Sequence, residues 1–146
     1  MKLPIYTISN RSGGVTIRGV IGFSRLDKNI KKAQWKLDNQ VMQDMIPFMP
    51  RQTGTFINNT IAQSSAMAGT GKVCAGAPPM GRFLYEGKVM VDPVTGSAWA
   101  RKNAKKVVTD KPLTYANPMA VPHWFDKAKS LYCKDWVKLV NDTLKE

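Results

Sequence analysis

The sequence is short of the residues that most often carry out chemistry. One histidine and two cysteines occur among the 146 residues, and only ten residues are acidic. A zinc site or a Ser-His or Cys-His pair would have to include His123, and neither Cys74 nor Cys133 lies in a metal-binding or catalytic motif. We therefore expect no metal ion, no cofactor and no structural disulfide, and we expect His123 to pack or hydrogen-bond locally at the start of a helix.

The few acidic residues are also too scattered for general acid-base catalysis. Glu86, Asp92, Asp110 and Asp126 fall near the irregular middle of the chain, and no two of them form a recognisable pair. A small basic nuclease would need such a pair, so the sequence disfavours an enzyme. We expect a protein that makes and breaks no covalent bond.

Long apolar runs are absent as well. No stretch reaches the ~18 apolar residues of a membrane-spanning helix. The opening MKLPIYTISN lacks the continuous apolar core of a secretory signal. We therefore expect a protein that is made in the cytoplasm and has no membrane contact.

Positive charge is what the sequence has in excess. Its 22 lysines and arginines give a formal net charge of +12, and such a field favours either nucleic acid or the acidic surface of another protein. Many small soluble proteins carry a similar excess on a solvated face, so charge alone does not choose among these roles. The length fits one domain with one continuous core.

One glycine-rich segment, AGTGKV at residues 68–73, has a superficial likeness to a phosphate-binding loop. Such a loop needs a glycine five positions before its Gly-Lys pair, where this chain has Ala66, and Ser or Thr after the lysine, where it has Val73. It should also open a helix, whereas the flanking pattern here predicts two strands. We therefore expect no nucleotide site.

A basic segment, RKNAKK at residues 101–106, is the second candidate for ligand binding. It follows Trp99, so its cations and one aromatic ring have the chemistry to hold phosphates and to stack on a base. A single aromatic residue is little for such a surface, and an exposed loop that contacts protein explains the segment as well. A small basic nucleic-acid-binding protein that uses residues 99–106 therefore remains the alternative function.

The first part of the chain has the pattern of a strand pair, or equally of a flexible arm, followed by a long helix. Residues 1–23 alternate around Gly13-Gly14 as two short strands would. Ser24 and Asp27 are typical of a helix start, and Pro47 should end or kink the helix near Ile46. The apolar stripe of this helix has spacings of three and four residues and consists of Leu26, Ile30, Ala33, Leu37, Val41 and Met45.

The middle of the chain predicts more strands. After Gly54, TFINNTIAQSS and KVCAGA read as a hairpin, and a short helix around Phe83 should be closed by Gly87 in a left-handed conformation. Residues 88–118 then read as two strands, KVMVDP and KPLTYANP, with Val89 and Val91 opposite Leu113 and Tyr115. Their connection is far longer than a tight turn needs, which is typical of a functional segment.

A final helix should begin at Pro122 and pack its apolar face on the sheet. Trp124 and Trp136 lie on or beside that face, so we expect them to be core anchors rather than ligand platforms. The pattern as a whole predicts one α+β domain over residues 24–146. Within it, residues 88–118 would form an extended β-hairpin arm.

Three ordered motifs carry a family resemblance. They are P-x-x-T-G-T at residues 50–55, YEGKVMVDP at residues 85–93 and PHWFDKAK at residues 122–129. With the sequence around them, over roughly residues 33–140, the chain resembles the minor capsid, or head-to-tail connector, proteins of long-tailed bacteriophages.

This resemblance implies a structural α+β protein in which a small antiparallel sheet packs against a long helix in the N-terminal half and a C-terminal helix. Its copies would form a ring in the neck of the virion, at the head-tail junction. The expected partners are further copies of the chain, the portal or adaptor and the tail proteins, with transient contact to phage DNA as a secondary role for the charge. An arm with unpaired strand edges can reach a neighbouring subunit. We expect the contacts to involve Lys88, Val89, Val91, Trp99, Arg101, Lys102, Lys105, Lys106, Leu113 and Tyr115.

Overall fold

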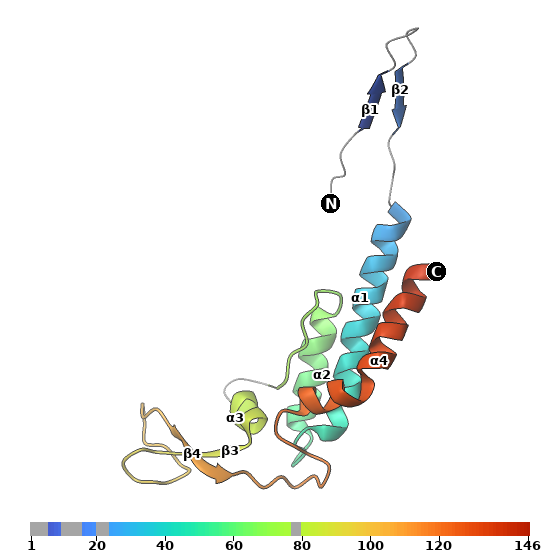
Figure 1. Cartoon of the computed structure of the whole chain (residues 1–146). Coiled ribbons are helices and arrows are strands. Elements are labelled where there is room, and N and C mark those ends of the chain that lie inside the picture. Colours follow the sequence, from blue (N-terminus) through green and yellow to red (C-terminus); the bar gives the residue numbers. More distant parts are fainter. Residues whose placement is uncertain (1–5, 10–15, 20–23, 77–79) are drawn as a thin grey trace.

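The computed structural model describes residues 6–9, 16–19, 24–76 and 80–146. Two strand pairs and a group of helices make up this part of the chain (Figure 1). In chain order the elements are β1 (Tyr6–Ser9), β2 (Thr16–Gly19), α1 (Ser24–Met45), the 3-10 helix η1 (Ile46–Phe48), α2 (Thr55–Met67), α3 (Met80–Glu86), β3 (Lys88–Val91), β4 (Val107–Pro112) and α4 (Trp124–Lys145).

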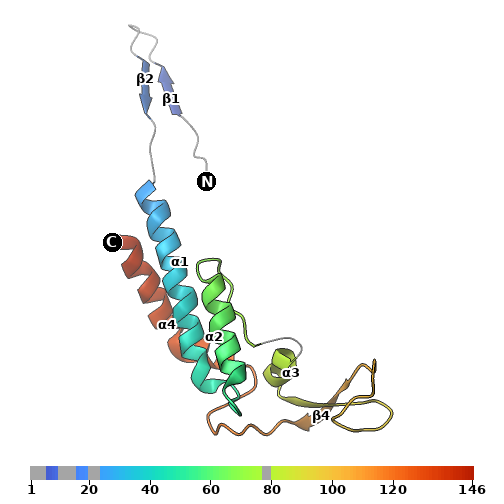
Figure 2. The ribbon, with the colours of Figure 1, turned by 180° about the vertical axis from the view of Figure 1, so that it is seen from behind.

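The long helix α1 lies between α2 and α4, which flank it on opposite sides in both views of the ribbon (Figures 1 and 2). The prediction of a long helix that ends near Ile46 is confirmed, because α1 gives way to η1 with Pro47 in its first turn. The C-terminal half of the predicted stripe is the part that packs: Val41 and Met45 are buried, whereas Leu26 and Ile30 are 44% and 49% exposed.

The core lies where the lower ends of the helices meet. Trp124, in the first turn of α4, has no exposed surface, and its ring meets Phe56 of α2 and Tyr85 of α3 edge to face, at centroid distances of 5.9 and 4.8 Å. Trp136 is buried too and donates a hydrogen bond of 2.6 Å to Asp44 Oδ2 of α1. Both tryptophans are therefore core anchors, as the sequence predicts.

The predicted hairpin at TFINNTIAQSS and KVCAGA is wrong, because the first segment forms helix α2. Its buried residues are Ile57, Thr60 and Ser64, which have helical spacing, but two of them are hydroxyl residues that an apolar pattern does not register. Thr60 Oγ1 accepts the Gly76 amide at 2.7 Å, and Ser64 Oγ accepts the Cys74 amide at 3.1 Å. The second segment thus runs beside α2 and is held by side chains instead of by a strand ladder.

The glycine-rich loop after α2 binds a carboxylate of the same chain, that of Asp38. Gly69 and Gly71, both with positive φ, donate their amides to Asp38 Oδ2 of α1 at 2.7 and 3.0 Å. Gln34 donates to the other oxygen of the same buried carboxylate at 2.7 Å. The loop therefore cradles a carboxylate of the protein itself, which ties the end of α2 to α1.

The two strand pairs are both antiparallel. β1 and β2 pair from Tyr6 with Gly19 to Ser9 with Thr16, and the predicted turn at Gly13-Gly14 lies outside the described residues. β3 and β4 pair through Lys88 with Pro112 and Val91 with Val107, with an irregularity between Lys88 and Met90.

The predicted register of the second pair is wrong, because β4 begins earlier than KPLTYANP and ends before Leu113. Leu113 and Tyr115 instead hydrogen-bond to the C-terminal end of α3 and the residue after it. The Leu113 amide donates to the Gly87 carbonyl at 2.8 Å, and the Tyr115 hydroxyl donates to the Leu84 carbonyl at 2.6 Å. The strand is formed by the β-branched residues Val107, Val108 and Thr109, which favour it.

The final helix begins two residues later than predicted. His123 precedes it in a left-handed conformation, with φ 52°, and Pro122 lies outside the helix. The buried face of α4 packs along α1, so the expectation that it covers a sheet is wrong. The two-stranded sheet β3–β4 adjoins α3 and lies away from α1 and α4 (Figure 1). Each helix of the described residues is too short or too polar to cross a lipid bilayer.

Candidate assembly interface

The segment from β3 to β4, residues 88–112, projects from the helices as an arm (Figure 1). Its base is Gly87, which ends α3 with φ 67° and donates its amide to the Phe83 carbonyl at 3.1 Å, so the predicted closure of this helix by Gly87 is confirmed. The Gly87 carbonyl then accepts the Leu113 amide, which joins the outgoing and returning ends of the arm. A short path back to α4 follows, with the His123 amide bonded to the Tyr85 carbonyl at 2.8 Å.

Asp92 holds the loop at the end of β3 in one shape. Its fully buried carboxylate accepts the backbone amides of Val94, Thr95 and Arg101 and the Arg101 guanidinium, with the Nε contact at 3.0 Å. The Arg101 guanidinium, together with these amides, keeps the pKa of Asp92 well below its usual range. Arg101 therefore stabilises the loop, and the Asp92 carboxylate compensates its charge.

The same loop exposes large apolar side chains to water. Trp99 is 87% exposed and Val94 is 73% exposed, although the residues around them are fixed by the Asp92 bonds. Exposed aromatic residues on a preorganised segment are typical of protein contacts, in which tryptophan is strongly enriched among the residues that contribute most binding energy.

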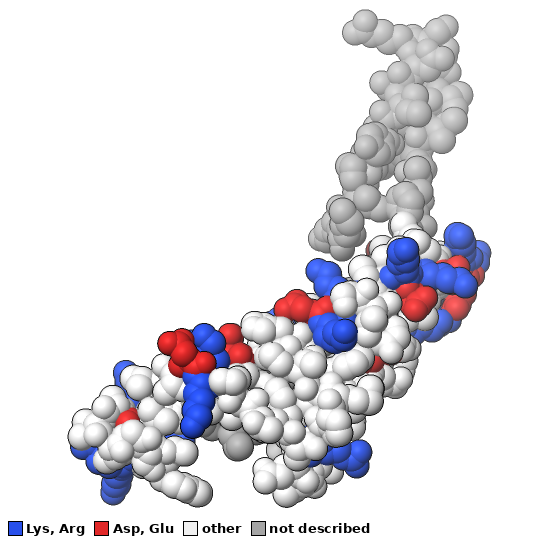
Figure 3. Space-filling model, turned by 60° about the horizontal axis from the view of Figure 1, so that its bottom comes forward, with Lys and Arg blue, Asp and Glu red and all other residues white. Residues whose placement is uncertain are grey.

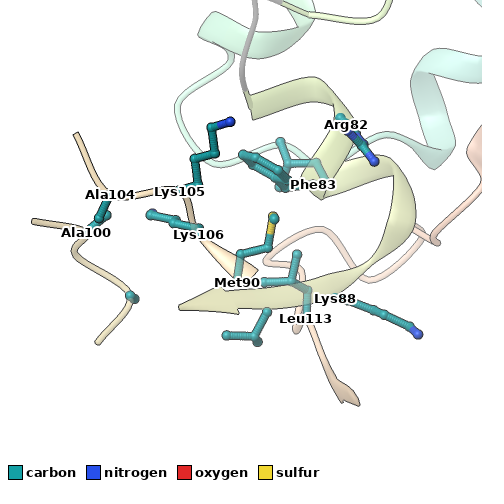
Figure 4. A pocket seen from close by; sticks show the side chains of 12 residues that line it. Arg82, Phe83, Lys88, Met90, Ala100, Ala104, Lys105, Lys106 and Leu113 are labelled. Atoms are coloured by element: carbon teal, nitrogen blue, oxygen red, sulfur yellow. The ribbon is translucent and has the colours of Figure 1, made fainter. Parts of the chain in front are cut away.

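The space between α3 and the arm is a groove of about 640 Å³. Met90 points from β3 toward Phe83 of α3, and Ala100 and Ala104 face them from the returning loop, while Lys105 extends beside Phe83 (Figure 4). We call this site the arm groove. It is lined by Arg82, Phe83, Leu84, Lys88, Val89, Met90, Ala98, Ala100, Ala104, Lys105, Lys106 and Leu113.

Five of the ten predicted contact residues meet in this groove: Lys88, Val89, Lys105, Lys106 and Leu113. The other five do not line it. Val91 pairs with Val107 in the sheet, Trp99 and Lys102 are exposed on the loop, Arg101 binds Asp92, and the Tyr115 hydroxyl bonds to α3. Sequence reasoning missed the walls made by Arg82, Phe83 and Met90. The sequence gives little indication of these walls, because the lining residues come from separate segments and several of them are alanines, so they form no apolar period.

His123 lies at the junction of α3 and α4. Its ring meets Tyr85 edge to face at 4.8 Å, and its nitrogens lie 3.7 Å from carboxylate oxygens of Glu86 and Asp126. Burial, followed by the nearby Asp126 carboxylate, raises the pKa of Tyr85. The prediction that His123 packs locally is confirmed, and within the described residues no cluster of His, Cys, Asp and Glu is arranged to hold a metal ion.

Positive charge is distributed over much of the molecule. Figure 3 shows lysine and arginine side chains at the end of the arm and at the far end of the helices, with acidic groups among them. On the face drawn, the cations form several small groups, which suits contacts with several neighbours better than one continuous nucleic-acid track.

The described residues thus form a packed body, a projecting arm and an exposed loop. The chain matches a family model described as minor capsid protein over residues 17–143, which is most of its length. It belongs to this minor capsid protein family and is a structural protein of a bacteriophage particle. Searches of the curated proteins and of the solved structures found no match.

The crowding around Gly87 provides a test of the base of the arm. A Cβ on Gly87 would lie 2.6 Å from Pro122 Cβ, whereas nothing lies within 4 Å of a Cβ on Gly96, which has nearly the same φ of 65°. We expect Gly87→Ala to lower the free energy of unfolding by about 2–4 kcal/mol and Gly96→Ala by about 1 kcal/mol. Urea unfolding followed by tryptophan fluorescence measures both, and equal losses would show that the base is not tightly packed.

The Asp92 loop should depend on pH through a single carboxylate. Because folding lowers the pKa of Asp92, its stabilisation is complete above the ordinary aspartate value of 3.8 and is lost as the pH falls further. We expect Asp92→Asn to speed hydrogen exchange at the Val94 and Arg101 amides at neutral pH, and the difference from wild type to shrink below pH 3.8. The exposed Asp110→Asn is the control, and equal exchange in all three proteins would contradict this role.

Proposed function

We propose that the protein is a head-to-tail connector of the phage neck, which works without catalysis as a homo-oligomeric ring between the portal side and the tail. The observation that carries the proposal is the imbalance between buried and exposed apolar side chains. Among the described residues, ten hydrophobic side chains are buried, whereas twelve large ones are exposed. A chain with so much exposed apolar surface is suited to contacts with other subunits in an assembly.

The arm supports a ring in particular. It projects from one end of the group of helices, so its contact surface differs from any surface on the opposite side of the same chain (Figure 2). Contacts between unlike surfaces repeat head to tail, and they close into a ring when the rotation between copies permits. β4 adds exposed Val107 and Val108 at an unpaired strand edge, which a neighbouring copy can cover.

The remaining positive charge then faces other components of the head-tail junction. Acidic surfaces of portal, adaptor or tail proteins fit this charge, and a channel wall that gripped DNA tightly would impede its passage. The rival function, nucleic-acid binding by residues 99–106, is favoured by the exposed Trp99 but weakened by the pairing of Arg101 with Asp92. Contact with DNA is therefore the secondary role.

A tryptophan substitution at the arm tests the proposal. Trp99→Ser removes the most exposed large apolar side chain of the described residues, whereas Val137→Ser removes a 55% exposed one from α4. We expect Trp99→Ser to reduce the yield of tailed, infectious particles by about tenfold or more, because truncating a central tryptophan weakens an interface by 2 kcal/mol or more.

Val137→Ser should leave that yield close to wild type, and both variants should keep the stability of the purified protein, since exposed substitutions change it by about 0.5 kcal/mol. Electron microscopy of the particles and the infectious titre measure the outcome. Normal attachment of tails by Trp99→Ser particles would count against an arm that joins subunits. A loss of DNA binding with normal attachment would favour the rival function.

A further inference from the structure

We propose that the arm groove is a receptor for an extended peptide segment of another virion protein, one that carries apolar side chains beside carboxylates. This inference rests on the structural role in the virion proposed above and names the chemistry of one partner. Two properties of the groove lead to it, an apolar floor and a rim of cations, most of which have no carboxylate partner among the described residues.

The floor offers an apolar peptide a place to bury side chains. Phe83 and Met90 approach each other across the groove, and small residues at 98, 100 and 104 leave the space between them open (Figure 4). Covering apolar surface gains about 25 cal/mol for each Å² removed from water. Methionine also adapts its shape to different occupants, which suits a surface that receives a chain segment.

The rim carries positive charge that the chain does not neutralise. Lys88 has one distant partner, Asp110, at 4.0 Å, and Arg82, Lys105 and Lys106 have no carboxylate within 4.0 Å among the described residues. The sequence places no Asp or Glu in residues 1–23 or 77–79, so the rest of the chain adds none. A segment with carboxylates would pair with these cations through charge-assisted hydrogen bonds.

A second copy of the chain is a poor source for that segment. Seven of its ten acidic residues already contact partners within the chain: Asp38, Asp44, Glu86, Asp92, Asp110, Asp126 and Glu146. The other three, Asp27, Asp135 and Asp142, lie singly on helices with lysines next to them or one turn away. A different protein is therefore the better source of the carboxylates.

Nucleic acid fits the groove less well than an acidic peptide. A phosphate backbone gains from rows of donors and from aromatic stacking, whereas the floor here is made mainly of alanine, valine, leucine and methionine with the single ring of Phe83. The apolar floor would stay uncovered beneath a phosphate chain. A peptide with both acidic and apolar side chains would cover the apolar floor and pair with the cations of the rim.

Photo-crosslinking in assembled particles tests the inference. A benzoylphenylalanine in place of Phe83 keeps an aromatic ring in the groove, and after irradiation its adducts are mapped by mass spectrometry. We expect one adduct with another virion protein, at a segment where Asp or Glu stands beside apolar residues. On the same background, Lys105→Glu should lower the adduct yield about tenfold, whereas Lys102→Glu, on the loop outside the groove, should leave it within about twofold.

Several outcomes would overturn the inference. They are adducts between two copies of the chain, adducts with DNA, equal effects of the two lysine variants, and no adduct in particles that carry tails. If the Phe83 replacement blocks assembly, the same probe at Leu113 on the other wall of the groove gives the measurement. A neck ring with an empty groove would refute this inference alone, whereas a groove adduct in a protein located elsewhere in the particle would refute the neck proposal alone.

Discussion

The burial of Trp124 is the interaction on which the rest of the structure depends. This side chain comes from the first turn of α4, and its ring contacts Phe56 of α2 and Tyr85 of α3 within the cluster that includes Met45 of α1. Truncating a buried aromatic side chain costs about 3–5 kcal/mol, a large share of the stability of a domain with few buried residues. The contact of this ring with Tyr85 ties α3, at whose end the arm begins, to the other helices.

Polar contacts then fix the parts that apolar packing does not reach. Asp38 binds the loop after α2, Asp44 binds the Trp136 indole and Asp92 closes the loop of the arm. Each carboxylate is matched by donors at 2.6–3.0 Å, so these acidic residues contribute to structure and not to a charged surface. As a consequence, the cations that remain are available to neighbours, in keeping with a structural protein of a virion.

Much of the fold follows from the sequence, for reasons that differ by element. The stripe ending at Val41 and Met45 predicts α1 because a long amphipathic helix repeats the same signal over about six turns. The apolar period fails to predict α2, because two of its buried positions are the polar residues Thr60 and Ser64, which hydrogen-bond to the following segment. Without them the remaining apolar residues alternate as in a strand. The arm was predicted, but the register of its strands is set with a hydrogen bond from the Leu113 amide to the Gly87 carbonyl, which lies outside any strand pattern. The groove was missed because its walls come from α3, β3 and the returning loop, which only the folded chain brings together.

A reconstruction of the neck of intact particles by electron cryomicroscopy tests the central claim most directly. The account predicts copies of this chain in a closed ring between portal and tail, with Trp99 and the free edge of β4 in each copy covered by its neighbour. Density for the chain elsewhere in the particle, or separate copies with solvent-exposed arms at the neck, would contradict it.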